Sequence, residues 1–142
     1  MKEQSGRSLI EIVGVLAIGV IMIAAAYNMY KSIDQRQKRL IAYEEIADVA
    51  KKTKILYEFS GYRDATIENL VAKGAISNKR SPIGTDWRIS SGATDDEFVI
   101  NIRGLSHGEC SYFVLKKSDW AYKVTPTECA KNDNNEVTFF VK

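Results

Sequence analysis

Residues 6–30, GRSLIEIVGVLAIGVIMIAAAYNMY, constrain how the rest of the chain can fold. Between Leu9 and Met29, only Glu11 and Asn28 are strongly polar. In helical conformation this run extends over roughly 31 Å, about the thickness of the hydrocarbon core of a bilayer. The run therefore predicts a helix that can cross a membrane. Glu11 lies near the start of this helix, where a carboxylate is costly unless it finds a partner.

The segment that precedes this run, MKEQSG, differs in layout from an ordinary secretory signal peptide. A signal peptide carries its apolar core before the cleavage site and loses that core on cleavage. Here the small residue Gly6 comes before the apolar run. Cleavage after Gly6 would remove a short charged leader and leave the apolar helix on the mature protein.

This N-terminus resembles that of the type IV pilin and type II secretion pseudopilin family. The resemblance rests on Lys2 in a short leader, Gly6 at its end, the sequence Ser8-Leu9-Ile10-Glu11 and the long apolar run. It implies that a prepilin peptidase cleaves after Gly6 and N-methylates Arg7, a position that is usually aromatic or aliphatic in the family. It also implies that Glu11 pairs with the terminal amine of a neighbouring subunit during assembly. The alternative is a single-pass anchor with a chance glutamate near its end.

The cysteines Cys110 and Cys129 favour a disulfide bond. They cannot form a four-ligand zinc site, because His107 is the only histidine in the chain. A disulfide that closes this loop contributes about 3 kcal/mol and requires an oxidising compartment. We therefore expect a globular part outside the cytoplasm, and two reduced, buried thiols are the alternative.

The charges that flank the apolar run favour the opposite orientation. Lys31, Arg36, Lys38 and Arg39 follow the run, whereas Lys2 and Arg7 precede it. The positive-inside rule would keep the C-terminal part in the cytoplasm, but long domains translocate largely regardless of such charges. We therefore base the orientation on the cysteines and the leader, which predict an inner-membrane protein with a periplasmic C-terminal domain.

The helix is expected to continue beyond the apolar run, because no proline or glycine occurs between Val20 and Ser60. Apolar residues recur at helical spacing in its second half, which predicts an amphipathic helix that supports a globular head. The inward-facing residues are Ala42, Tyr43, Ile46, Val49, Ala50, Thr53, Leu56 and Tyr57. A coiled coil is the alternative for this segment.

The rest of the chain predicts a small antiparallel sheet with two short helices. The first helix spans 65–73, with Asp64 as its N-cap and Gly74 after its end, and an exposed loop follows at 78–84. Strands are expected at 87–90, 97–103, 120–124 and 137–141, and a Cys110-bearing helix at 107–116. This order resembles the C-terminal region of type IVb pilins.

The predicted fold class is α+β and pilin-like: a long N-terminal helix packs against a small antiparallel sheet with a C-terminal disulfide region. The predicted organisation is a leader at 1–6, a transmembrane and filament-core helix at 7–30, and a globular head at 31–142. Within the head, we assign 31–59 to the amphipathic helix, 60–85 to the helix-to-sheet connection and 86–142 to the sheet and disulfide region.

Other chemistries find weak support in the sequence, so we predict neither an enzyme nor a cofactor. Ser106, His107 and Asp119 have the residue types of a hydrolase but lack a nucleophile elbow. The oxygen-rich runs 95–97 and 132–136 are interpreted as solvated turns in preference to calcium sites. The pairs Lys79-Arg80 and Lys116-Lys117 do not form a basic stripe, so we do not predict nucleic acid as a partner.

The resemblance predicts a structural subunit of a type IV pilus-like filament that ends up on the bacterial surface. Its partners would be identical or related pilin subunits, the prepilin peptidase, an inner-membrane assembly platform and, before assembly, membrane lipid. The alternatives are a pseudopilin of a periplasmic secretion system, a minor pilin or tip adhesin, and an unrelated single-pass periplasmic protein.

Overall fold

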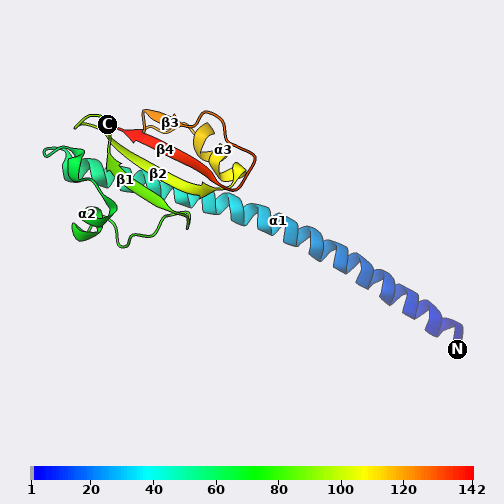
Figure 1. The fold of residues 1–142 in the computed structure, drawn as a ribbon. Helices are drawn as coiled ribbons and strands as arrows, with labels where there is room; N and C mark the ends of the chain where they lie inside the picture. Colours follow the sequence, from blue (N-terminus) through cyan, green and yellow to red (C-terminus); the bar gives the residue numbers. More distant parts are fainter. Residues whose placement is uncertain (1) are drawn as a thin grey trace. The chain divides into compact units, whose positions relative to one another are not determined.

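The protein combines one long helix with a four-stranded sheet and three short helical elements (Figure 1). The computed structural model describes the backbone of residues 2–142 and the side chains from residue 8 onward. The elements in chain order are α1 (Lys2–Tyr57), the 3-10 helix η1 (Tyr62–Asp64), α2 (Ile67–Ala72), β1 (Trp87–Ser91), β2 (Phe98–Leu105), α3 (His107–Leu115), β3 (Lys123–Thr125) and β4 (Asn135–Val141).

The chain divides into two compact units, one up to Gln37 and one over Lys38–Lys142. Helix α1 runs through both units as one continuous helix, as the lack of helix-breaking residues predicts. It begins at Lys2, inside the predicted leader, and passes through Gly6 without interruption. The side chains of residues 1–5 and of Arg7 lie outside the described residues.

The second half of α1 provides one side of the core of the second unit. Seven of the eight residues predicted to face inward are buried: Ala42, Tyr43, Ile46, Val49, Ala50, Thr53 and Tyr57. The prediction for Leu56 is wrong, because 37% of this side chain is exposed. The buried Thr53 donates its hydroxyl hydrogen to the Val49 carbonyl at 2.8 Å and thus needs no partner outside the helix.

The segment after α1 differs from its prediction in the position of the helix cap. Gly61 adopts a φ of 76°, a left-handed conformation that suits glycine, and the chain turns there into η1. Thr66, and not Asp64, is the N-cap of α2, since its side chain accepts a hydrogen bond from the Asn69 amide. Asp64 instead offers its carbonyl oxygen to the Tyr57 hydroxyl at 2.9 Å. Gly74, with a φ of 74°, follows the end of α2 as expected.

The sheet is antiparallel with the strand order β1-β2-β4-β3, so the last strand lies between β2 and β3. The predicted hairpin between β1 and β2 is confirmed. On β2, Phe98, Ile100 and Ile102 are buried on one face, and Ile100 lies opposite Phe139 of β4. The strand predicted at 120–124 is shorter and later, at Lys123–Thr125.

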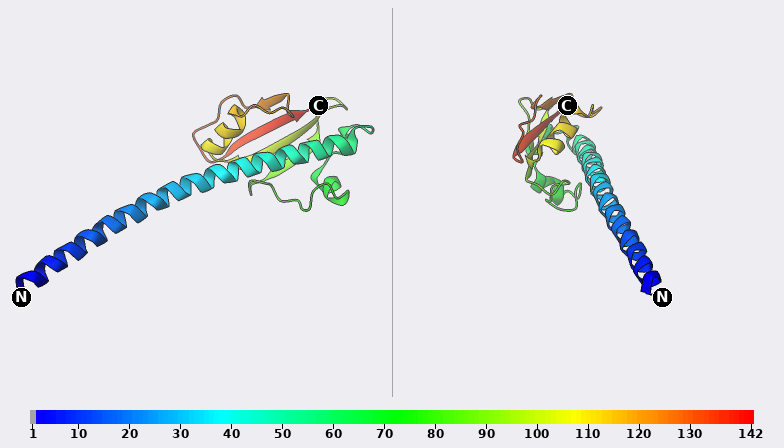
Figure 2. Two further views of the ribbon diagram at one scale, coloured as in Figure 1. Left: turned by 180° about the vertical axis from the view of Figure 1, so that it is seen from behind. Right: turned by 90° about the vertical axis from the view of Figure 1, so that its right-hand side faces the viewer.

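An aromatic cluster joins the sheet, α3 and the second half of α1. The Tyr43 ring lies 6.4 Å from Phe113 of α3 and 5.9 Å from Trp120, measured between centroids, and Trp120 lies 5.0 Å from Phe139. In both views of Figure 2, the part of α1 within the second unit runs along the sheet. Trp120 is thus a core residue outside the strand that was predicted to contain it. The fold is the α+β, pilin-like class expected from the sequence.

Candidate assembly and interface sites

The first unit exposes apolar side chains on all sides of α1. Every described residue from Ser8 to Ala17 is exposed, and so are the large apolar side chains farther along. Among them are Leu9 (66%), Val15 (70%), Ile21 (69%) and Met29 (69%). A helix that is apolar all round must be covered by lipid or by other helices. Within the described residues, α1 is the helix with the length and apolarity to cross a membrane.

Glu11 is an exposed carboxylate inside this apolar surface. Leu9, Ile10, Ile12 and Val13 surround it in sequence, and each has more than half of its side chain exposed. Among the described side chains, none makes an ion pair or a hydrogen bond with Glu11. Within residues 8–142, the Glu11 carboxylate is therefore left without a partner.

Gly6 lies on the first turns of α1, before the apolar surface begins. An added Cβ at Gly6 would meet no atom within 4 Å, so packing within the chain does not require a glycine here. The predicted role of Arg7 as the new N-terminus falls on a side chain outside the described residues. Gly6, Arg7 and Glu11 thus lie within two turns of one helix.

The predicted disulfide between Cys110 and Cys129 is present, with the two Cα atoms 6.0 Å apart. It links α3 to the segment that precedes β4, as expected from the sequence. Helix α3 begins with a capping box, in which the Ser106 side chain accepts from the Glu109 amide and the Glu109 carboxylate accepts from the Ser106 amide. Ser106 therefore caps a helix.

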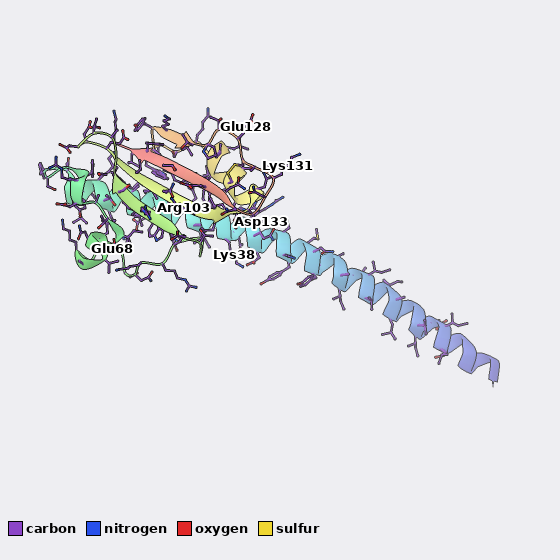
Figure 3. The ribbon with its side chains drawn as sticks, in the orientation of Figure 1. Lys38, Glu68, Arg103, Glu128, Lys131 and Asp133 are labelled. Carbon is purple, nitrogen blue, oxygen red and sulfur yellow. A yellow bond between two sulfur atoms is a disulfide. The ribbon has the colours of Figure 1, made fainter. Side chains whose placement is uncertain are left out.

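Asn135 organises the loop between the disulfide and β4, a role that sequence reasoning missed. Its side-chain amide donates to the carbonyls of Asn132 (2.8 Å), Ala130 (3.0 Å) and Leu105 (3.3 Å), and its side-chain oxygen accepts from the Ala130 amide. The His107 ring also lies 3.1 Å from the Ala130 carbonyl. Residues 132–134 thus form an exposed bend, as predicted, and Lys131 and Asp133 point outward (Figure 3). The prediction of a solvated turn is wrong for 135–136, because both residues belong to β4 and Asn135 is buried.

Glu97 is a second polar residue whose burial the sequence did not indicate. Only 6% of it is exposed, and its carboxylate accepts a 2.6 Å hydrogen bond from the Tyr122 hydroxyl. A Cβ at position 92 would overlap the Glu97 side chain, so Gly92 provides the space that this carboxylate occupies. Asp95 and Asp96 of the same acidic run are exposed. No cluster of three or more potential metal ligands occurs among the described residues.

Two tyrosines of the head have shifted pKa values. The hydrogen bond to Glu97 favours the neutral phenol and is the main reason why the pKa of Tyr122 is raised above 10.0. Burial is the main cause that raises the pKa of Tyr62, and the nearby carboxylates of Glu58 and Asp96 add to it. Both pKa shifts arise from contacts within the head.

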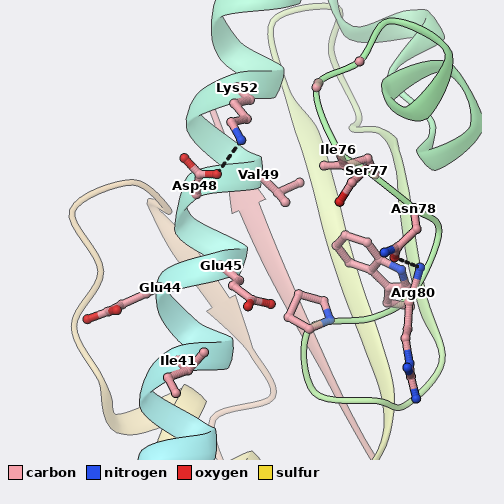
Figure 4. A pocket seen from close by; sticks show the side chains of 14 residues that line it. Ile41, Glu44, Glu45, Asp48, Val49, Lys52, Ile76, Ser77, Asn78 and Arg80 are labelled. Carbon is pink, nitrogen blue, oxygen red and sulfur yellow. Dashed lines mark hydrogen bonds and ion pairs between the residues drawn. The ribbon is translucent and has the colours of Figure 1, made fainter.

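A groove of 640 Å³ lies in the second unit between α1 and the segment that leads from α2 to β1 (Figure 4). Its apolar lining includes Ile41, Val49 and Ile76. Glu45 and Val49 point from α1 toward the facing loop, whereas Glu44 points away from it. The sequence predicted the loop at 78–84 but not the groove that the loop forms with α1.

No family model matches the chain, and no curated protein matches it significantly. The fold and the exposed segment still define a class of protein. Its N-terminal helix is apolar and long enough to cross a membrane once. The same helix continues into an α+β head that contains a disulfide bond.

Proposed function

We propose that the protein is a structural subunit of a type IV pilus-like filament. In this proposal it is made as an inner-membrane prepilin with a periplasmic head, cleaved after Gly6 and methylated at Arg7. It then polymerises through the first half of α1. The observation that carries the proposal is the exposed carboxylate of Glu11, which has no partner among the described side chains and lies within an otherwise apolar, fully exposed helix surface.

The physics of transfer from lipid to filament explains why such a carboxylate is useful. An apolar helix that leaves lipid for a bundle of similar helices gains little from hydrophobic burial, since both surroundings are equally apolar. The register between subunits must then come from a polar contact. Pairing of Glu11 with the terminal amine of Arg7 on a neighbour would supply that contact, because an unpaired carboxylate opposes docking in an apolar environment.

The disulfide-bonded head supports a filament that works outside the cytoplasm. A disulfide persists in oxidising compartments such as the periplasm and the cell surface. It also favours a pilin over a pseudopilin of a secretion system, because major pseudopilins usually lack such a bond. The pseudopilin remains the second candidate, since it would use the same helix. Filaments visible on the cell surface at native expression distinguish the two.

The proposal is tested by the intact mass and N-terminal sequence of the protein purified from membranes, with and without reductant. We expect a chain that begins at N-methylated Arg7 and gains the mass of two hydrogens on reduction. An intact Met1 in a strain with an active prepilin peptidase would contradict processing, and the plain membrane anchor would then be the better description.

A further inference from the structure

The groove between α1 and the 74–87 segment is lined by apolar side chains together with polar and charged ones, and the acidic side chain of Glu45 points from α1 toward the facing loop. Ile41, Val49, Ile76 and Pro82 line it together with Glu45. Glu45 is exposed and has no ion pair or hydrogen-bond partner among the described side chains. Such a groove suits an arginine or lysine, because the aliphatic stem can lie on the apolar lining while the charged head reaches the carboxylate.

The other charges around the groove leave Glu45 as the acceptor on α1. Asp48 is already paired with Lys52, with 2.7 Å between the carboxylate oxygen and the ammonium nitrogen (Figure 4). Glu44 is exposed but points away from the facing loop. Arg80 lies on the opposite wall and makes no ion pair with Glu45. A cation from outside would therefore complete an incomplete charge pair.

The chain itself carries a surface of matching chemistry. Ile33, Arg36 and Leu40 follow one another at spacings of three and four, so they share one face of α1. All three are exposed, with 55% of Ile33 and 42% of Leu40 accessible. Arg36 makes no ion pair with any described side chain. This face presents a cation between two apolar residues, as the groove presents a carboxylate between apolar residues.

We propose that the groove binds the Ile33–Arg36–Leu40 face of a second copy of the chain, with Arg36 of that copy paired to Glu45. The proposal rests on the filament function and adds a contact between heads to the contact between apolar helices. Arg36 and Glu45 are nine positions apart in the sequence, so two parallel copies would be displaced by roughly 13 Å along the helix direction.

Another basic face of α1 fits the groove less well. Lys51 and Ile55 share a face of α1 at a spacing of four, and Glu58 follows in the turn directly after the helix ends at Tyr57. Docking of this face would bring the exposed carboxylate of Glu58 toward Glu45, and the two would repel each other. Charge complementarity therefore favours the face that contains Arg36.

The test is a charge exchange scored by the amount of filament sheared from cells. We expect Glu45→Arg to lower the yield at least about tenfold, since like charges would meet in the groove. Glu44→Arg makes the same change in net charge at a lining residue whose side chain points away from the facing loop, and it should leave the yield within about twofold. Combining Glu45→Arg with Arg36→Glu should restore filaments, because the pair is reformed with reversed polarity.

Cysteine pairing gives a readout that does not depend on yield. In one chain, positions 36 and 45 lie about 13 Å apart on a helix, too far for a disulfide. An Arg36→Cys/Glu45→Cys variant should therefore give a ladder of disulfide-linked copies on a non-reducing gel of sheared filaments. The same gel run with reductant should show a single band.

Several results would overturn the docking. An unchanged yield with Glu45→Arg, or rescue by Lys51→Glu in place of Arg36→Glu, would refute the pairing and leave the filament function intact. A missing ladder in filaments that assemble normally would do the same. A processed wild-type protein that never forms filaments under any condition would overturn both the docking and the proposed function.

Discussion

Single side chains stabilise the head through polar contacts that link distant parts of the chain. Glu97, directly before β2, and Tyr122, directly before β3, are joined by a 2.6 Å hydrogen bond. Glu97 is almost fully buried, and the groups nearest to it include the backbone of Gly92, whose amide donates to the Glu97 carbonyl. Without the Tyr122 donor, the Glu97 carboxylate would still be removed from water but would lose this hydrogen bond. The hydrogen bond therefore stabilises the folded head.

The hydrogen bond predicts a specific dependence of stability on pH. The fold raises the pKa of Tyr122 above the value of 10.0 for a free tyrosine. The contribution of this hydrogen bond to the free energy of unfolding is therefore complete below pH 10.0, and it is lost as the pH rises through the raised pKa. Tyr122→Phe should lower the free energy of unfolding at pH 7. The difference from wild type should narrow above about pH 10, where the wild-type tyrosine also loses the bond. Urea unfolding of the reductant-free protein at several pH values measures this, and a constant difference up to pH 11 would refute it.

The surface of helix α1 changes along its length. Up to Gln37 its apolar side chains are exposed, whereas from Ala42 to Tyr57 one stripe is buried against the sheet and α3. The buried side chains of this stripe form part of the hydrophobic core of the head. The helix is therefore part of the head as well as a segment that could span a membrane.

Truncation of the stripe should destabilise the head in proportion to burial. Ile46 is completely buried, and Ile46→Ala should lower the free energy of unfolding by about 2–5 kcal/mol. Ile55 lies on the same helix with 72% of its side chain exposed. Ile55→Ala should therefore change the free energy of unfolding by less than about 0.5 kcal/mol. Thermal unfolding of both variants gives the comparison. Equal effects would mean that the stripe is not part of the core.

The protein as a whole combines a stable head with a surface that is unsuited to water. The head has its own core, a disulfide and a paired sheet, but the first unit has its large apolar side chains exposed. Such a surface requires cover by lipid or by other helices. The proposed filament satisfies this need by moving the helix from one apolar environment to another.

The proposed role of Glu11 predicts a separation between stability and assembly. Glu11→Val should leave a processed, membrane-resident protein with a normal disulfide, yet filament yield should fall at least about tenfold because the polar contact is lost. Glu11→Asp retains the charge and should assemble better than Glu11→Val. Immunoblots of membranes and of sheared filaments separate the two effects. Normal filaments from Glu11→Val would contradict the mechanism.

The sequence was informative wherever a structural rule acts on neighbouring residues. The helix up to Tyr57 follows from the absence of proline and glycine, and the hairpin between β1 and β2 follows from alternating apolar residues. The link between Cys110 and Cys129 follows from their being the only cysteines. The N-terminal residues that suggest processing and assembly are likewise contiguous.

Features that depend on contacts between distant segments emerged from the folded structure. Nothing local places β4 between β2 and β3, because the choice of partner strand depends on how the whole sheet covers α1. Asn135 and Glu97 are polar residues of ordinary turn sequences, and their burial depends on donors and carbonyls that other segments supply. The groove beside Glu45 forms between α1 and the 74–87 segment. It depends on how these two segments lie in the folded chain, and the residue pattern of either segment alone does not predict it.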